Sequence, residues 1–431
     1  MLEPDCGLHF SPGEDENFFA SLPSRPGVLL LAMKEEKARP YLARTADIRR
    51  AAERLLRAPE SLSKRLNLRD VVADIRYRVT GSKFEQTLSM YEQARKSFPG
   101  RYREFMRLRP PALLKVNLRN EYPRCYVTRR IRADGGFYFG PFASRGAAEA
   151  FSEAFLDLFK IRRCQIKIRR DPDFPGCIYS EMKMCLAPCF AGCSKQEYDV
   201  EVGRVLQTFE TAGAFLTREI AGQREAASEA LDFEKAAALH KRLEKVSAAL
   251  RGWGELTRRI EEIDAVILQR GAEEKTIVVF PVLAGILAEP LFLRFGELSS
   301  EPKSVEGMLR KVLEPQTNIV RQKSGERNPD SAETIDRSQP DMLDNLPNFA
   351  SGPVDLPASY REPYGLQSAS PDLTEHLALL SRWFYSKPRD GEILFRNGSW
   401  PYRRILRACG RLLSPAQALP RTSKTSPRRA N

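Results

Sequence analysis

Four cysteines within 26 residues constrain this chain more than any other feature of its sequence. Their spacing is C-x12-C-x7-C-x3-C, whereas structural zinc sites usually contain two closely spaced C-x2-C-like pairs. Ligation by thiolates alone suits an iron–sulfur cluster, and the three histidines of the chain lie far from these cysteines. Three explanations of the grouped cysteines stay open. In order of preference they are an iron–sulfur cluster, a zinc ion and simple burial in the core. The candidate ligands are Cys164, Cys177, Cys185 and Cys189, with Cys193 as an alternative to Cys189.

Charge and length narrow the class of protein. The chain has 431 residues, enough for about two or three domains, and a formal net charge of +13. This charge makes nucleic acid the first candidate partner, the alternative being a basic surface without such a role. No stretch approaches the about 18 consecutive apolar residues of a membrane-spanning helix, and the acidic start is no signal peptide. We therefore expect a cytoplasmic protein with no membrane partner, in which the cysteines stay reduced.

The apolar pattern predicts an α+β protein of several modules. Residues 26–60 read as strand, turn, strand and helix, and residues 61–110 read as basic helix. Residues 195–251 are helical, with Asp232 as the cap between two antiparallel helices. The expected order is a loose leader (1–25), an α/β module (26–115), strands with a glycine-rich turn and the cysteines (116–194), a helical hairpin (195–255), a small β-rich module (262–298), a linker (299–372), and a carboxy-terminal helix with a basic tail (373–431).

Basic residues surround the first cysteine of the set. Side chains of this kind supply DNA affinity that depends on salt and not on base sequence, and they are expected to lower the pKa of nearby thiols. Tyr138, Phe139 and Phe142 lie close by in the sequence and either stack on bases or pack in the core. The predicted DNA-binding residues are Lys160, Arg162, Arg163, Lys167, Arg169 and Arg170.

Three segments together resemble UvrC, the nuclease subunit of bacterial nucleotide excision repair, and its shorter homologue Cho. They are YFGPFASRGAAEAF at 138–151, the run RRC…C…CLAPC that ends at Cys189, and ALDFEKAAAL at 230–239. The resemblance covers roughly residues 26–298, and the RNase H-like carboxy-terminal half of UvrC has no counterpart. It implies that the four cysteines hold a [4Fe–4S] cluster and that the protein acts on damaged DNA in the cytoplasm.

The amino-terminal module resembles a GIY-YIG nuclease domain, which cuts one DNA strand with a tyrosine, cations and a glutamate-bound Mg²⁺ or Mn²⁺. The resemblance implies catalytic roles for Tyr41, Arg44 and Glu92. Other positions depart from the family pattern. Apolar residues stand at three positions where the family has side chains that take part in the chemistry, and these are Leu29, Ala51 and Leu113. Loss of several such groups costs orders of magnitude in rate. The two resulting hypotheses are an incising enzyme and a non-catalytic DNA-binding adaptor with a degenerate nuclease domain.

The segment 230–239 is similar to the UVR motif, a helical hairpin that docks UvrB. The resemblance implies a UvrB-like partner, whereas the alternative is a helical pair that is complete in itself. Where the family commonly carries Arg-Asp, this chain has His240-Lys241, so any charge pairing with the partner is altered. The residues expected to contact the partner are Leu231, Phe233, Ala236 and Ala237.

Overall fold

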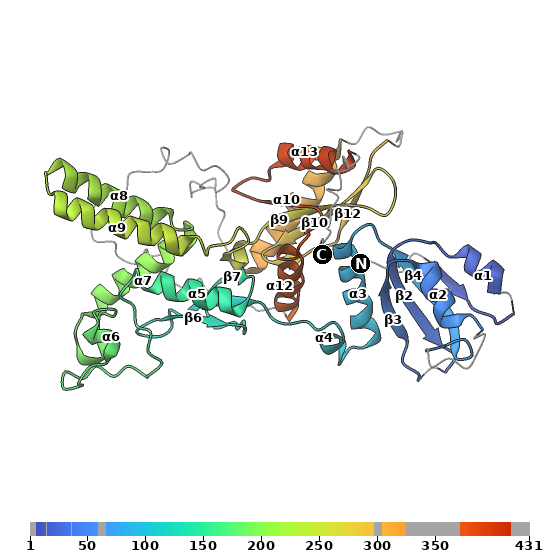
Figure 1. Ribbon diagram of the computed structural model, residues 1–431, viewed down its shortest axis with the longest axis horizontal. Helices are drawn as coiled ribbons and strands as arrows, with labels where there is room; N and C mark the ends of the chain where they lie inside the picture. The colour runs from blue at the N-terminus through green and yellow to red at the C-terminus, as the bar shows by residue number, and fades with distance from the viewer. Residues whose placement is uncertain are drawn as a thin grey trace, which may run out of the picture.

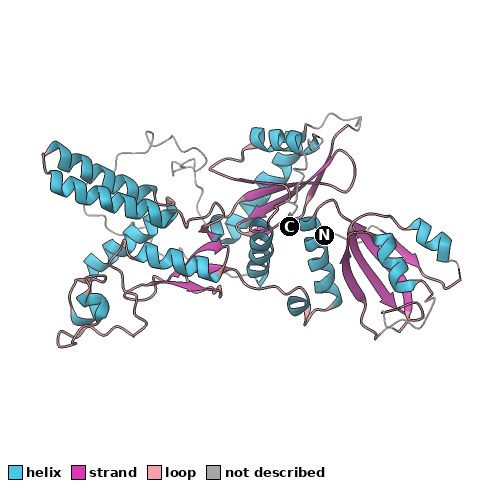
Figure 2. Ribbon diagram, in the orientation of Figure 1, coloured by secondary structure: helices cyan, strands magenta, loops and turns pink. Residues whose placement is uncertain are grey.

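The computed structural model describes residues 6–13, 15–35, 37–58, 66–296, 304–324 and 371–414. The described residues form three antiparallel sheets and twelve α-helices, so the predicted α+β class is confirmed. Figure 1 shows the sheets spread along the long axis of the molecule, with a pair of long helices at one end. Figure 2 shows that strands and helices alternate along most of that axis. Every described helix is too short or too polar to cross a membrane.

The amino-terminal sheet has four strands in the order β1-β4-β2-β3. Helices cover both of its faces: α2 packs with Leu29 on one side, and α3 packs with Val28 and Leu42 on the other. Asp47 begins α2 by accepting a hydrogen bond from the Arg50 N–H at 2.9 Å. The elements are β1 (Cys6–His9), α1 (Asp15–Ser21), β2 (Gly27–Met33), β3 (Tyr41–Thr45), α2 (Ile48–Leu56), β4 (Val72–Val79), α3 (Lys83–Ser97) and α4 (Tyr102–Phe105).

Two expectations for this region are wrong. Within the expected leader, residues 6–13 and 15–25 are not loose, because β1 pairs with β4 and the side chains of Phe10 and Phe19 are buried beneath α2. Residues 61–110 are not helical throughout, because β4 occupies part of them. Its arginines alternate with buried apolar residues, and this two-residue period was hidden by the basic composition of the segment.

The middle sheet has the strand order β6-β5-β7-β8 and is covered by α5 and α7. Its core consists largely of aromatic rings, and the ring centroids of Phe155 and Phe209 lie 4.2 Å apart. Helix α5 is amphipathic, since Ala148, Phe151 and Phe155 are buried on one of its faces. The elements are β5 (Ala112–Val116), β6 (Cys125–Thr128), β7 (Phe137–Phe142), α5 (Arg145–Leu156), α6 (Ile178–Glu181), a 3₁₀ turn η1 (Pro188–Phe190), α7 (Lys195–Glu210) and β8 (Arg258–Arg259).

The predicted helical hairpin is formed by α8 (Ala214–Glu229) and α9 (Phe233–Leu250). Leu231 takes the left-handed backbone conformation in the turn, with φ of 57°. The Asp232 carboxylate accepts a hydrogen bond from the Lys235 N–H at 3.1 Å, which confirms the predicted cap. In Figure 1 the turn of this hairpin lies at the end of the molecule farthest from the amino-terminal sheet.

The third sheet joins residues 262–298 to the carboxy-terminal part of the chain. Strand β13 pairs with β9, so the β-rich module is completed by residues expected to belong to the tail. Helix α10 begins in the predicted linker and α13 lies in the predicted tail, and both bury apolar residues against the sheet. The elements are η2 (Ile260–Glu262), β9 (Ala265–Arg270), β10 (Thr276–Leu283), β11 (Ile286–Leu287), β12 (Leu291–Arg294), α10 (Val305–Ser324), α12 (Pro371–Phe384), β13 (Glu392–Phe395) and α13 (Tyr402–Leu413). Most of the predicted linker, and the tail beyond Ser414, lie outside the described residues.

Candidate nucleic-acid interface and partner surface

The four predicted cysteine ligands lie near one another in the stretch between α5 and α7. Burial raises the pKa of Cys185 to about 11, and the nearby thiols of Cys164, Cys189 and Cys177 act in the same direction. Burial also raises the pKa of Cys189. The expectation that neighbouring cations lower the pKa is therefore wrong for these two thiols, because burial is the largest influence on the pKa of each.

The four thiols are donors of the chemical type that a thiolate-bound cluster needs. The Ala187 N–H donates to Cys185 Sγ at 3.3 Å, and Arg162 Nη1 lies 3.9 Å from Cys164 Sγ, so sulfurs of the set already have hydrogen-bond donors. Such donors tune iron–sulfur clusters. Within the described ranges, no three His, Cys, Asp or Glu side chains converge closely enough to hold a single metal ion. An iron–sulfur cluster is larger than one ion, and four neighbouring thiols fit it in chemical type.

Arg162 is a structural residue and not an exposed cation. It is 7 % exposed, and its guanidinium donates to the carbonyl oxygens of Tyr122 and Ile166, each at 2.8 Å. Its backbone N–H donates to the Tyr198 hydroxyl at 2.9 Å. These contacts contradict the prediction that Arg162 binds DNA, because its donors are used inside the protein. They join the β5–β6 loop to the stretch that carries the cysteines.

The other five predicted DNA-binding residues divide into two groups. Arg163 is largely covered, and its Nη2 lies 2.8 Å from Asp157 Oδ1 in an ion pair. The remaining four side chains are exposed on the same stretch of chain, in positions where phosphate oxygens can reach them. These four residues are Lys160, Lys167, Arg169 and Arg170.

The aromatic residues of the glycine-rich segment belong to the core. Tyr138 and Phe139 are fully buried, and Phe142 is 3 % exposed. The Tyr138 hydroxyl accepts a hydrogen bond from the Arg132 N–H at 2.9 Å. Core packing, the alternative to base stacking for these three residues, is therefore confirmed.

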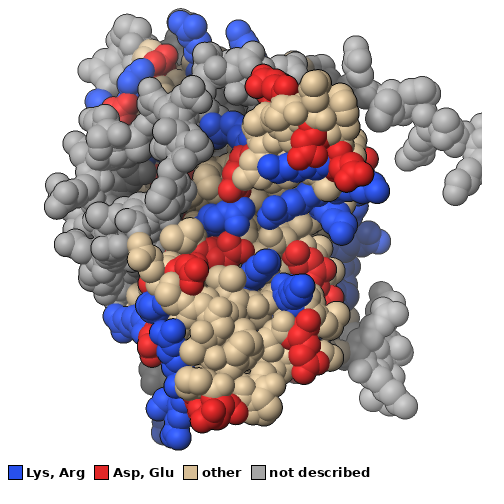
Figure 3. Space-filling model, turned by 90° about the vertical axis from the view of Figure 1, so that its left-hand side faces the viewer, with Lys and Arg blue, Asp and Glu red and all other residues tan. Residues whose placement is uncertain are grey.

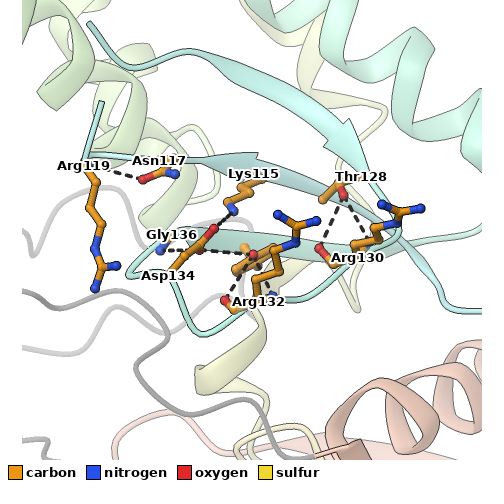
Figure 4. Close-up of polar contacts among 9 residues, drawn as sticks. Lys115, Asn117, Arg119, Thr128, Arg130, Arg132, Asp134 and Gly136 are labelled. Carbon is orange, nitrogen blue, oxygen red and sulfur yellow. Dashed lines mark hydrogen bonds and ion pairs between the residues drawn. The ribbon is translucent and has the colours of Figure 1, made fainter. Parts of the chain in front are cut away.

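Two loops of the middle sheet present exposed arginines that were not among the predicted DNA-binding residues. They are the β5–β6 loop, residues 117–124, and the β6–β7 loop, residues 129–136. Figure 4 shows residues of both loops, with an ion pair between Lys115 of β5 and Asp134 of the β6–β7 loop. The overlooked signal was the run TRRIR directly before the glycine-rich turn. The exposed arginines are Arg119, Arg129, Arg130 and Arg132.

The predicted catalytic residues are not gathered at one place. Tyr41 packs on the α2 face of the amino-terminal sheet. Arg44, three residues later on the same strand, donates from Nη1 to Thr87 Oγ1 of α3 at 3.0 Å, on the opposite face. Glu92 also lies on α3, where it is partly buried. Glu85, at the start of that helix, is buried and accepts a hydrogen bond from the Gly81 N–H at 2.7 Å.

The tip of the α8–α9 hairpin carries the most exposed large apolar side chains in the described part of the chain. Leu231 is 71 % exposed and Phe233 is 67 % exposed. Ala237 is exposed beside them, and Ala236 is half-buried. Figure 3 faces this end of the molecule and shows uncharged surface bordered by Lys and Arg and by Asp and Glu. All four residues predicted to contact a partner therefore lie on or beside one apolar surface.

Comparison with known proteins matches one part of the chain to a family model. Residues 112–208, which contain the middle sheet strands β5 to β7, the four cysteines and most of α7, match the model described as UvrC/Cho excinuclease, middle domain. No solved structure matches the chain.

Longer matches are to proteins named UvrABC system protein C. The protein from Dehalococcoides mccartyi (strain CBDB1) is 26 % identical over 278 residues, which is 63 % of this chain and 45 % of that protein. The one from Carboxydothermus hydrogenoformans is 27 % identical over 287 residues, 65 % of this chain and 46 % of that protein. The one from Desulfatibacillum aliphaticivorans is 29 % identical over 202 residues, 47 % of this chain and 33 % of that protein. The match thus spans less than half the length of these relatives.

Proposed function

Because residues 112–208 carry the middle domain of the UvrC/Cho excinuclease family, we propose that this chain is a DNA-binding protein of nucleotide excision repair. The observation that carries the proposal is the coincidence of that domain with exposed cations around the cysteines: Lys160, Lys167, Arg169 and Arg170. Cations of this kind bind the phosphate backbone whatever the base sequence, as a repair protein requires. Damaged duplex DNA is the substrate class that follows.

We propose that Cys164, Cys177, Cys185 and Cys189 hold a [4Fe–4S] cluster. The all-cysteine donor set and the hydrogen-bond donors near Cys185 and Cys164 support thiolate ligation of a cluster. A bound cluster would supply a rigid cross-link between distant points of a stretch that has little regular structure of its own. Binding requires the thiols to lose their protons, which the metal itself drives. Iron and sulfide content of anaerobically purified protein tests this assignment.

We propose that the hairpin tip docks a UvrB-type partner. The exposed side chains of Leu231 and Phe233 support this, because apolar residues of this size rarely stay exposed at a helix turn without a partner. The partner surface needs an apolar groove for Phe233. It also needs a carboxylate near Lys241, where the family pattern has an aspartate and this chain has a cation.

We propose that the chain assists incision and does not catalyse it. The separation of Tyr41 from Arg44 and Glu92 by the amino-terminal sheet supports the adaptor over the enzyme, because one metal-dependent site needs its groups together. The adaptor is also supported by three positions at which the nuclease family has chemical groups and this chain has apolar residues. They are Leu29, Ala51 and Leu113.

A nicking assay tests this function. Lesion-bearing duplex is incubated with the chain and Mg²⁺ or Mn²⁺, with and without UvrA and UvrB, while binding to the same duplex is measured in parallel. We expect binding without nicking by the chain alone. Nicking that Tyr41→Phe abolishes would establish the enzyme instead. Absence of any binding to duplex would remove the DNA-binding proposal itself.

A further inference from the structure

The two arginine-bearing loops of the middle sheet form a second basic surface, separate from the cations around the cysteines. Residues 117–136 contain five arginines, against one glutamate and one aspartate. Four of these arginines are exposed, and within the described ranges none of the four forms an ion pair through its guanidinium. The four are Arg119, Arg129, Arg130 and Arg132, which we call the arginine surface.

A buried ion pair fixes the loop beneath the arginine surface. Lys115 is 4 % exposed and pairs with Asp134, so the acidic residue of this loop is already neutralised from inside the protein. The Asp134 carboxylate also accepts a hydrogen bond from the Gly136 N–H at 3.2 Å. The exposed arginines of the β6–β7 loop, Arg129, Arg130 and Arg132, therefore lack a competing carboxylate on that loop.

Backbone hydrogen bonds hold the arginines in place (Figure 4). The Arg132 N–H donates to the buried Tyr138 hydroxyl at 2.9 Å, and the Arg130 N–H donates to Thr128 Oγ1 at 3.0 Å. The Arg119 N–H donates to Asn117 Oδ1 at 3.0 Å. A fixed backbone lowers the entropy lost when the side chains engage a ligand.

Two glycines let the loops approach each other. Gly135 has φ of 66°, and a Cβ there would lie 3.1 Å from Arg119 Nε, so Arg119 lies against the turn of the other loop. A Cβ on Gly136 would lie 2.5 Å from Lys115 Cε. The β6–β7 loop therefore runs back across the sheet from Thr128, at the Leu113 end of β5, toward Arg119, and the arginines lie along that path (Figure 4).

The arginine surface is joined to the exposed cations near the cysteines. Arg162 donates to the Tyr122 carbonyl oxygen at 2.8 Å, and the Tyr198 hydroxyl donates to the Pro123 carbonyl oxygen at 2.8 Å. Burial raises the pKa of the Tyr122 phenol, and Arg170 opposes that rise, so Arg170 lies near this loop. These contacts fasten the β5–β6 loop to the cysteine-bearing stretch and to α7.

We propose that Arg119, Arg129, Arg130 and Arg132 are a binding site for the phosphate backbone of duplex DNA. One guanidinium group can donate two parallel hydrogen bonds to the oxygens of a phosphate group, so a set of arginines suits a ligand with many phosphates. A protein partner is less well matched, because the exposed large apolar residues of the described chain all lie outside residues 117–136, and protein interfaces need such anchors. The choice of DNA over another polyanion rests on the proposed function.

The test compares two triple variants of the full chain. One carries Arg119→Gln, Arg130→Gln and Arg132→Gln. The matched control carries Lys311→Gln, Arg403→Gln and Arg407→Gln, which removes the same charge from exposed positions on α10 and α13. Affinity for a fluorescent DNA duplex is measured by anisotropy over a series of salt concentrations, and circular dichroism checks the fold of each variant.

We expect the loop variant to lose about tenfold or more in affinity at low salt and to lower the salt slope by about 2.7, for three lost phosphate contacts. The control should resemble the unaltered chain. Equal behaviour of the two variants would overturn the site, as would a loop variant that loses affinity for duplex RNA but not for DNA. If the unaltered chain binds no duplex, the proposed function itself fails, which is a distinct result.

Discussion

Arg162 shows how one residue type serves two purposes in the same stretch of chain. Six basic residues flank the first cysteine, and sequence treats them alike. The structure buries Arg162 and exposes Arg169. Only the three-dimensional position of the Tyr122 and Ile166 carbonyl oxygens separates the two roles. A local sequence pattern does not contain that information.

The burial of Arg162 leads to a stability prediction. Arg162→Ala leaves two carbonyl oxygens without their charged donor and should lower the free energy of unfolding by about 2 to 4 kcal/mol. Arg169→Ala, at an exposed position, should change it by less than about 0.5 kcal/mol. Urea denaturation followed by tryptophan fluorescence measures both. Equal effects of the two substitutions would contradict the structural role of Arg162.

The Lys115–Asp134 pair leads to a pH prediction. Burial alone would raise the pKa of the Asp134 carboxyl, but the hydrogen bond and charge of Lys115 lower it below its ordinary value. A lowered folded-state pKa gives stability that is present above the unfolded-state value and is lost as pH falls through the folded-state value. The unaltered chain should therefore lose stability on acidification below about pH 4.

The matching variant is Asp134→Asn. It should be less stable than the unaltered chain by about 3 kcal/mol at neutral pH, because Lys115 stays buried without its partner. The difference between the two proteins should shrink as pH falls. Thermal unfolding at several pH values measures this difference in stability. A difference that stays constant as pH falls would refute the role of the Asp134 carboxylate.

Elements with a strong local signal were predicted from sequence, and elements that depend on distant partners were not. The α8–α9 hairpin, its Asp232 cap and the apolar face of α5 follow from helical periodicity. Strands β1 and β13 are each four residues long and are stabilised by pairing with β4 and β9. Four residues carry too little periodicity to be distinguished from a leader or a tail.

The exposed tip of the α8–α9 hairpin leads to a prediction about partner binding. Leu231→Ser with Phe233→Ser should leave stability within about 0.5 kcal/mol, because both side chains are exposed. The same change should weaken binding to a UvrB-type partner by about 30-fold or more, as expected for loss of an aromatic anchor. Glu229→Gln, an exposed polar change on the same hairpin, is the control, and calorimetry measures both. Unchanged partner affinity in the double variant would exclude the tip as a docking site.

Across the whole molecule, contacts between distant parts of the chain decide what each module can do. Glu375 of α12 is 4 % exposed and accepts hydrogen bonds from the Tyr91 and Tyr102 hydroxyls at 2.5 and 2.7 Å. Arg103 Nε lies 2.6 Å from the same carboxylate. These bonds dock the carboxy-terminal part on α3 and α4 and bury the α3 face that includes Met90. No local pattern predicts a contact between residues so far apart in sequence.

We propose that DNA is held by residues 112–208, which match the UvrC/Cho middle-domain model. Hydrogen exchange of the full chain, with and without saturating duplex DNA, tests it most directly. We predict that DNA protects residues 117–136 and 160–170, while the amino-terminal sheet and its helices exchange as before. Protection confined to residues 26–97, or no protection anywhere, would contradict the claim.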